Sequence, residues 1–164
     1  MIVKTGLGKD SHRFDDDLSN RKLMLAGVQF DNAPPLKGNS DADVVIHAVT
    51  NSISSITGRN ILGKVADKMC LEQGVTDSKE FLKLALKDMQ DWNITHLAIS
   101  IECLRPKISP KIDAMKKSLT NILEIAYENI GITATSGEGL TDFGKGRGIQ
   151  AIAIITVEKN KGDK

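Results

Sequence analysis

The chain has 164 residues, of which 40% are hydrophobic and 26% are charged, a composition typical of a single globular domain with a substantial core. Its 22 Lys and Arg against 21 Asp and Glu leave a net charge of +1, which argues against a nucleic-acid partner. The sequence contains no apolar run of about 18 residues and no leader-like start, and Cys70 and Cys103 form no CxxC pair, so we expect no membrane partner and a cytoplasmic location.

Apolar periodicity predicts strands that alternate with helices along the chain. The expected strands cover 2–8, 23–30, 96–104, 132–136 and 148–158, and 59–77 has no clear period. The expected helices begin near 41, 78 and 110, and the last of them is expected to run to Gly131. The pattern predicts an α/β fold with two layers (α+β), built as one domain over 1–158 with a polar tail at 159–164. The last strand is apolar on both faces. Helices on one face and another subunit on the other would explain this, and a second helix layer would explain it equally well.

The helix near residue 41 carries a histidine away from its apolar stripe. Ser40 is the expected N-cap, with Asp43 at capping-box spacing, and Gly58 is the expected end. The stripe places His47 on the opposite, polar side, next to a helix start whose N–H groups attract anions. We therefore expect this corner to hold an anion or a metal.

Two further metal-ligand types stand at the end of the first predicted strand. Asp10 and His12 are two residues apart, so their side chains share a face. Together with His47 they form a plausible three-ligand zinc set with an open fourth position. The alternatives are a surface turn at Asp10 and a solvated histidine at position 47. His96 is interpreted as structural.

The glycine-rich loop over 137–148 is the second candidate region. Its glycines allow the backbone to approach a ligand closely, and Glu138 is a candidate oxygen ligand for magnesium. A flexible hairpin loop is the alternative. The Arg105-Pro106-Lys107 triplet could hold a phosphate or nucleotide, or it could be a solvated basic turn. Because no Ser-His-Asp order and no activated cysteine is evident, any catalysis is expected to rely on metals and phosphate-binding groups.

These segments, in this order and spacing, resemble the 2-C-methyl-D-erythritol 2,4-cyclodiphosphate synthase family. The resemblance runs from Gly6 to about Val157. It rests on five stretches, which are GLGKDSHRF (6–14), NSDADVVIHA (39–48), DS (77–78), RPK (105–107) and ATSGEGL (134–140).

The resemblance implies a homotrimer with its sites between neighbouring subunits, with one face of a mixed sheet toward the trimer axis. It implies that Asp10, His12 and His47 bind Zn²⁺ or another divalent cation, and that Glu138 binds Mg²⁺ or Mn²⁺ with the substrate diphosphate. The implied substrate-binding residues on the erythritol side are Asn39, Ser40, Leu62 and Gly63, next to Asp10 and His12. Those on the cytidine side are Cys103, Leu104, Arg105, Pro106, Lys107, Thr135 and Ser136. Lys145 stands near the implied trimer axis, where relatives often have Arg.

The implied reaction converts 4-diphosphocytidyl-2-C-methyl-D-erythritol 2-phosphate, a cytidine diphosphate derivative, into 2-C-methyl-D-erythritol 2,4-cyclodiphosphate and CMP in non-mevalonate isoprenoid biosynthesis. The substrate supplies its own nucleophile, so the expected work of the protein is to offset charge. Two cations, the helix start at Ser40 as a bed for the attacking phosphate, and catalytic polar donors at Asn39 and Ser136 would do so.

Two of the departures from the family pattern bear on the expected catalysis. Asn39 stands where many relatives carry His, and Ile61 replaces a carboxylate of the erythritol pocket. Two alternative functions therefore stay open: a non-catalytic, metal-binding trimeric relative, and a zinc-dependent phosphohydrolase.

Overall fold

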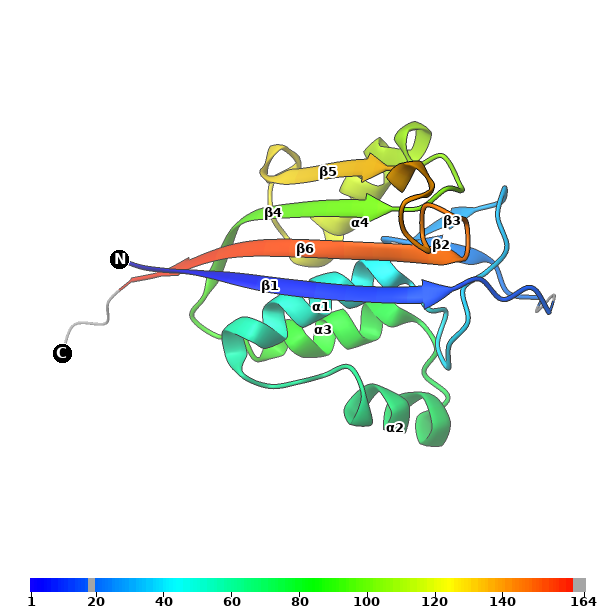
Figure 1. Ribbon diagram of the computed structural model, residues 1–164. Helices are drawn as coiled ribbons and strands as arrows, with labels where there is room; N and C mark the ends of the chain where they lie inside the picture. The colour runs from blue at the N-terminus through cyan, green and yellow to red at the C-terminus, as the bar shows by residue number, and fades with distance from the viewer. Residues whose placement is uncertain (18–19, 161–164) are drawn as a thin grey trace.

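The computed structural model describes residues 1–17 and 20–160, and its centre is a four-stranded mixed sheet with strand order β1-β6-β4-β5. Helices cover one side of this sheet, and α2 lies furthest from it (Figure 1). The strands are β1 (Ile2–Arg13), β4 (Asn93–Glu102), β5 (Ile130–Thr135) and β6 (Gly148–Lys159), with a separate hairpin of β2 (Leu23–Leu25) and β3 (Val28–Phe30). The helices are α1 (Val44–Thr57), α2 (Lys64–Gln73), α3 (Ser78–Lys87) and α4 (Ile112–Leu123), with short 3₁₀ turns η1 (Ser109–Lys111), η2 (Tyr127–Asn129) and η3 (Gly137–Gly139).

The pairing of the strands confirms the expected mixed sheet. Strand β6 runs antiparallel to both β1 and β4, whereas β4 and β5 are parallel. Strand β1 is longer than predicted and continues to Arg13, so Asp10 and His12 belong to the strand itself. Side chains alternate along a strand, and both residues therefore keep the shared face that their spacing predicts.

Helix α1 packs directly on β1 because two glycines of the strand carry no side chain. A Cβ at Gly6 would lie 2.3 Å from the carbonyl oxygen of Ser52, and one at Gly8 would lie 2.0 Å from that of Ala48. Both contacts are to helix backbone, which cannot rotate away as a side-chain end could. The glycine seam, meaning Gly6 and Gly8 against Ala48 and Ser52, thus sets the distance between strand and helix.

We expect Gly8→Ala to destabilise the fold by about 3 kcal/mol, because the added methyl group would overlap backbone atoms of α1. Chemical denaturation measures this change. Gly131→Ala is the matched control, since a Cβ there meets no atom within 4 Å. Equal stability of the two variants would contradict the close backbone contact.

The start of α1 differs from the prediction. The N-cap is Asp43, whose carboxylate accepts hydrogen bonds from the N–H groups of Val45 at 3.1 Å and Ile46 at 3.0 Å. The same carboxylate accepts the N–H groups of Ala26 at 2.9 Å and Gly27 at 2.6 Å in the turn between β2 and β3. Ser40 was expected to cap the helix. The buried Asp43 is the cap instead, because its carboxylate bonds the start of the helix and the hairpin turn simultaneously. Gly58 ends the helix as predicted, with φ +77.

Three other elements also differ from expectation. Residues 23–30 form a hairpin rather than one strand, because Ala26 and Gly27 adopt positive φ values of 54 and 73. The stretch without a period contains α2, which buries only Ala66 and so has no apolar stripe. The helix expected to run to Gly131 ends at Leu123, where Glu124 turns left-handed at φ 55.

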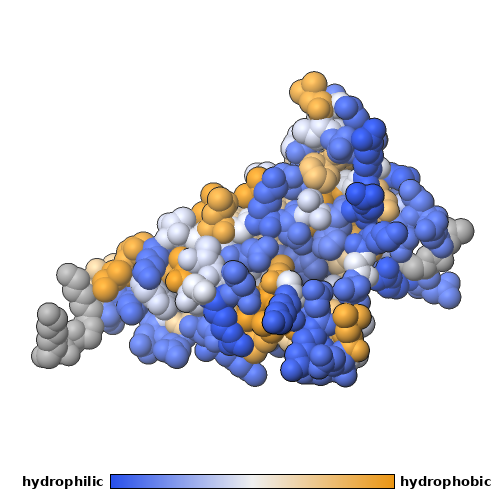
Figure 2. Space-filling view, turned by 60° about the horizontal axis from the view of Figure 1, so that its bottom comes forward, coloured by the Kyte–Doolittle hydropathy of each residue, from blue (hydrophilic) through white to orange (hydrophobic). Residues whose placement is uncertain are grey.

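The side of the sheet that faces away from the helices exposes several apolar side chains, among them Val3, Leu7 and Ile154. In the pairing register Leu7, Ile154 and Ala98 are neighbours across three strands. In the view of Figure 2, hydrophilic side chains cover most of the surface, and hydrophobic ones form separate spots.

The helices and the C-terminal tail bear on two further expectations, a chain without a membrane span and a polar tail at 159–164. None of the helices in the part of the chain that the structure describes is long and apolar enough to cross a membrane. Residues 161–164 of the expected polar tail lie outside the described residues.

Candidate metal centre

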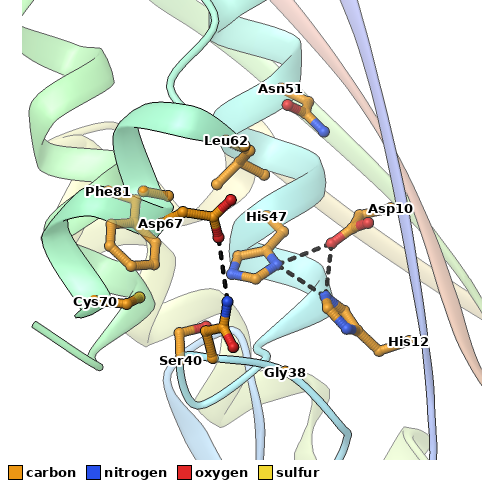
Figure 3. A pocket seen from close by; sticks show the side chains of 13 residues that line it. Asp10, His12, Gly38, Ser40, His47, Asn51, Leu62, Asp67, Cys70 and Phe81 are labelled. Atoms are coloured by element: carbon orange, nitrogen blue, oxygen red, sulfur yellow. Dashed lines mark hydrogen bonds and ion pairs between the residues drawn. The ribbon is translucent and has the colours of Figure 1, made fainter.

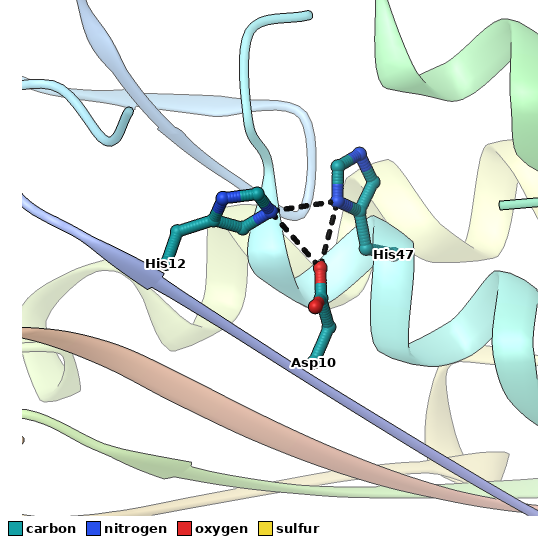
Figure 4. Close-up of side chains that lie close together, drawn as sticks. All are labelled: Asp10, His12 and His47. Carbon is teal, nitrogen blue, oxygen red and sulfur yellow. Dashed lines mark hydrogen bonds and ion pairs between the residues drawn. The ribbon is translucent and has the colours of Figure 1, made fainter. Parts of the chain in front are cut away.

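Asp10, His12 and His47 meet at one point, as the sequence predicts. The three side chains come from β1 and α1 and turn their ligand atoms toward one another (Figure 4). Asp10 Oδ2 lies 2.8 Å from His47 Nδ1 and 3.1 Å from His12 Nε2, and the two ring nitrogens are 3.2 Å apart. One carboxylate oxygen and two imidazole nitrogens therefore form a nearly equilateral triangle.

The outer nitrogen of each ring is held by a neighbouring group that sets its tautomer. His12 Nδ1 donates to the carbonyl oxygen of Lys37 at 2.8 Å. His47 Nε2 lies 2.9 Å from Ser78 Oγ, and the Ser78 hydroxyl in turn donates to Asp41. Because a serine that donates to a carboxylate accepts from the imidazole, His47 Nε2 carries the proton. The lone pairs of His12 Nε2 and His47 Nδ1 are then available inside the triangle.

Charge within the cluster is reflected in its pKa values. Burial would raise the pKa of Asp10, but hydrogen bonds and charge from His12 and His47 outweigh it and hold that pKa far below its usual value. Burial would likewise lower the pKa of His12, and the Asp10 carboxylate outweighs it and raises that pKa. The Asp10 carboxylate thus stabilises positive charge inside the triangle, which is where a bound cation would lie.

The triangle has the size and chemistry of a metal site. Tetrahedral bonds of about 2.0–2.1 Å, as zinc makes to histidine and carboxylate, would separate the three ligand atoms by roughly 3.3 Å. The separations in the cluster are 2.8–3.2 Å, so a small opening would accommodate an ion. A set of one carboxylate oxygen and two imidazoles also leaves a fourth position open. The cluster therefore fits a divalent cation.

We expect Ser78→Ala to weaken metal binding by about 10–100-fold, because an outer partner that orients a ligand histidine is lost. Competition with a chromogenic chelator measures this affinity. Ser54→Ala is the matched control, since its buried hydroxyl on α1 has no hydrogen-bond partner among the described residues. An unchanged metal affinity in Ser78→Ala would contradict the role of the Ser78 contact.

The triangle forms one wall of a cavity of about 330 Å³. Asp10, His12 and His47 face a wall formed by Leu62 and by residues of α2 such as Asp67 (Figure 3). Asn39 Nδ2 donates to Asp67 Oδ1 at 3.3 Å. The structure brings four other predicted site residues into this cavity: Asn39, Ser40, Leu62 and Gly63. The remaining lining residues are Gly38, Asn51, Ala66, Asp67, Cys70 and Phe81.

One alternative and one expectation for this corner are wrong. His47 is not the solvated histidine of the alternative, since it is 7% exposed on a helix that packs between the sheet and α3. The helix also does not start at Ser40, and the Asp43 carboxylate accepts the N–H groups of Val45 and Ile46, which were expected to attract an anion. At the cavity, the helix start without a side-chain cap is that of α2, which follows Gly63.

The other predicted site residues gather at the opposite edge strand. The N–H of Cys103 donates to the carbonyl oxygen of Thr135 at 3.1 Å, which joins the end of β4 to the end of β5. Leu104, Arg105, Pro106 and Lys107 line a second cavity of about 540 Å³ with Phe30 and Lys111. Glu138 follows Ser136 in the exposed turn η3, with φ 46, and Lys145 lies further along the loop to β6. Ile61 is fully buried.

These two groups of residues lie on opposite edges of one sheet. Strands β1 and β5 are separated by three strand spacings, or about 14 Å. The ends of β1, β4 and β5 that carry the predicted residues all point the same way (Figure 1). In a single chain, the Asp10–His12–His47 cluster and the segment with Glu138 thus lie at the same end of the sheet but on opposite edges, too far apart to form one site.

Sequence reasoning missed the part of the cavity that α2 supplies. Ala66, Asp67 and Cys70 line it, and no periodic pattern identified the helix that carries them. Asn51 lies on the same side of α1 as His47, four residues on, and its side chain donates to the carbonyl oxygen of Lys9 at 3.1 Å. Helical spacing from His47 could have identified Asn51.

Comparison with known proteins shows close relatives over almost the whole chain. The YgbB family model matches residues 3–158. The 2-C-methyl-D-erythritol 2,4-cyclodiphosphate synthase of Chlamydia caviae is 48% identical over 95% of this chain and 89% of its own, and that of Chlamydia trachomatis serovar L2b is 43% identical over 95% and 88%.

Solved structures agree with these relatives. The bifunctional IspDF from Campylobacter jejuni superimposes with a TM-score of 0.87 at 26% identity, over 98% of this chain and 43% of that longer one. A 2C-methyl-D-erythritol-2,4-cyclodiphosphate synthase with CDP bound superimposes with a TM-score of 0.82 at 25% identity, over 94% of this chain and 100% of its own. The chain therefore belongs to the YgbB family, the enzyme family of these 2-C-methyl-D-erythritol 2,4-cyclodiphosphate synthases.

Proposed function

We propose that this chain closes the cyclic diphosphate of 2-C-methyl-D-erythritol 2,4-cyclodiphosphate at the cavity that holds Asp10, His12 and His47. In the reaction, a 2-phosphate oxygen of 4-diphosphocytidyl-2-C-methyl-D-erythritol 2-phosphate attacks the β-phosphorus. The bond from the β-phosphorus to the bridging oxygen breaks, and CMP leaves with that oxygen. The triangle of ligand atoms with edges of 2.8–3.2 Å, in a chain of this family, is the observation that carries the proposal.

The metals divide between the two groups of residues. Asp10, His12 and His47 would hold Zn²⁺, and the exposed Glu138 would hold Mg²⁺ or Mn²⁺ with the substrate diphosphate. A divalent cation bound at each place would supply charge neutralisation and polarise a phosphoryl oxygen. Without that help, two like charges about 4 Å apart repel by about 4 kcal/mol at an effective dielectric of 20.

The chain's own side chains would position the substrate. Asn39 and Ser136 are proposed as catalytic donors to developing negative charge, and Ser40, Leu62 and Gly63 as contacts of the erythritol phosphate. On the cytidine side we propose Cys103, Leu104, Arg105, Pro106 and Lys107 with Thr135. Holding the two ends of the substrate together could contribute about 7–11 kcal/mol, the range of well-oriented intramolecular reactions.

A shared site in a homotrimer would bring the two groups of residues together. The separation of about 14 Å across the sheet within one chain supports this arrangement, because the β5 edge of one subunit would have to face the β1 edge of the next. We propose that the sheet face with Val3, Leu7 and Ile154 turns toward the trimer axis, with Lys145 near that axis. Residues 1–158 would act as the single catalytic unit of each subunit, in the cytoplasm.

The test incubates the purified protein with the diphosphocytidyl substrate and Mg²⁺ and follows the products by ³¹P NMR. We expect stoichiometric CMP and cyclic diphosphate. Inorganic phosphate without the cyclic product would favour the phosphohydrolase. No product with intact metal binding would favour the non-catalytic relative, for which Asn39 and Ile61 are the departures from the family pattern.

A further inference from the structure

Arg21 braces the loop that carries Asn39 and Ser40. Its Nη1 donates to the carbonyl oxygen of Gly38 at 2.7 Å and to that of Ser40 at 2.8 Å. Its Nη2 donates to Asp15 Oδ2 at 3.2 Å. One planar guanidinium thus bonds the backbone on both sides of Asn39. Through Asp15 it also connects this loop to the segment that follows β1.

The same loop is fixed from the metal side by different contacts. The carbonyl oxygen of Lys37 accepts from His12 Nδ1 at 2.8 Å, and the N–H of Lys37 donates to the carbonyl oxygen of Arg13 at 2.9 Å. These bonds hold the start of the loop at Lys37, two residues before Asn39, which lines the cavity. Further along the loop, Arg21 bonds the carbonyl groups on both sides of Asn39, while the Ser40 hydroxyl accepts the N–H of Ala42 at 3.0 Å.

The position of Arg21 behind the loop separates it from the reacting atoms. Arg21 lines a cavity of about 370 Å³ with Met24 and Thr76, and Asn39 and Ser40 border both this cavity and the metal cavity. The Arg21 side chain does not line the cavity that holds Asp10, His12 and His47. Any effect of Arg21 on the reaction would therefore pass through the loop.

We propose that Arg21 is a positioning residue for the cyclisation, which sets where Asn39 and Ser40 meet the substrate. This inference rests on the proposed function. Arginine suits the task because its rigid fork can donate to two carbonyl groups and one carboxylate at once, which the single ammonium group of lysine cannot match. Since displacement of a positioning group by about 1 Å can cost about 10²-fold in rate, loss of the brace reduces kcat without removing a ligand of the metal.

The experiment compares Arg21→Ala and Arg21→Lys with Arg59→Ala. Arg59 is the matched control because its guanidinium also pairs with a carboxylate, that of Asp88, at 2.8 and 3.0 Å, and does not line the metal cavity. We expect kcat to fall about 10–100-fold in Arg21→Ala, by less in Arg21→Lys, and little in Arg59→Ala. Metal stoichiometry should stay equal in all of them. Millimolar guanidinium should restore part of the rate in Arg21→Ala and have no such effect in Arg59→Ala.

A second measurement does not depend on turnover. Hydrogen exchange of the peptide that spans 37–43 should become faster in Arg21→Ala and stay unchanged in Arg59→Ala. Unchanged exchange at 37–43, or a kcat and thermal midpoint of Arg21→Ala that both match Arg59→Ala, would overturn the inference. Absence of cyclic product from the unsubstituted protein would instead overturn the proposed function, and the exchange data would still decide whether Arg21 holds the loop.

Discussion

His47→Ala is expected to abolish stoichiometric binding of a divalent cation and to lower the cyclisation rate by about 10³-fold or more. Two ligand atoms are too few to hold zinc in competition with water and chelators, and the charge stabilisation that a metal supplies is worth several kcal/mol. Metal analysis of the purified variant and an assay for CMP release measure the two effects. Stoichiometric metal in His47→Ala would refute the assignment of the ligands.

Two further variants separate loss of the metal from loss of the fold. His96→Ala removes a histidine from an exposed position of β4 and should retain the metal. Asp10→Asn keeps the shape of its side chain but removes the carboxylate charge, so we expect weaker metal binding in a folded protein. Both variants matter because His47 is buried, and its removal would take one hydrogen bond from the Ser78 hydroxyl, which keeps its bond to Asp41, at a cost of about 1 kcal/mol.

Mixing two inactive variants should restore activity if the site is shared between subunits. Glu138→Ala should be inactive with an intact Asp10–His12–His47 cluster, whereas His47→Ala should be inactive with an intact Glu138. In every trimer that contains both variants, one of the three sites would combine an intact Asp10–His12–His47 cluster with an intact Glu138, as expected for head-to-tail interfaces. Co-expression of the two variants with different tags, followed by tandem purification and the CMP assay, measures this recovery.

The control for this mixing experiment carries both substitutions in one chain, together with the unsubstituted chain. If both halves of the site came from the same subunit, the mixture of single variants would stay inactive, while the wild-type chain of the control mixture would stay active. Recovery in the first mixture therefore supports sites between subunits, and its absence would contradict them.

Local sequence patterns were sufficient to predict much of the Asp10–His12–His47 cluster. Alternation along β1 placed Asp10 and His12 on one face, and helical spacing placed His47 on α1. That these elements meet depends on Gly6 and Gly8, whose close packing under α1 no pattern of apolar residues revealed. The N-cap was misplaced because Ser40 and Asp43 are both good capping residues. The choice between them depends on the Ala26–Gly27 turn, which is distant in sequence.

The limits of local patterns are clearest in α2. Its helix buries only Ala66 and starts at Gly63 without a side-chain cap, so neither an apolar stripe nor a capping signal marks it. Asp67, which reaches Asn39 across the cavity, was missed for that reason. The extent of α4 was overestimated because apolar residues continue at helical spacing past Glu124, although the backbone there turns left-handed.

The glycine seam also has a consequence for which ion the cluster can accept. Because the seam joins backbone to backbone, the strand and the helix that carry Asp10 and His47 cannot easily move apart. The small opening that admits an ion would then come from rotation of the ligand side chains. This suits a small ion better than Ca²⁺, which needs six to eight oxygen ligands at about 2.3–2.6 Å.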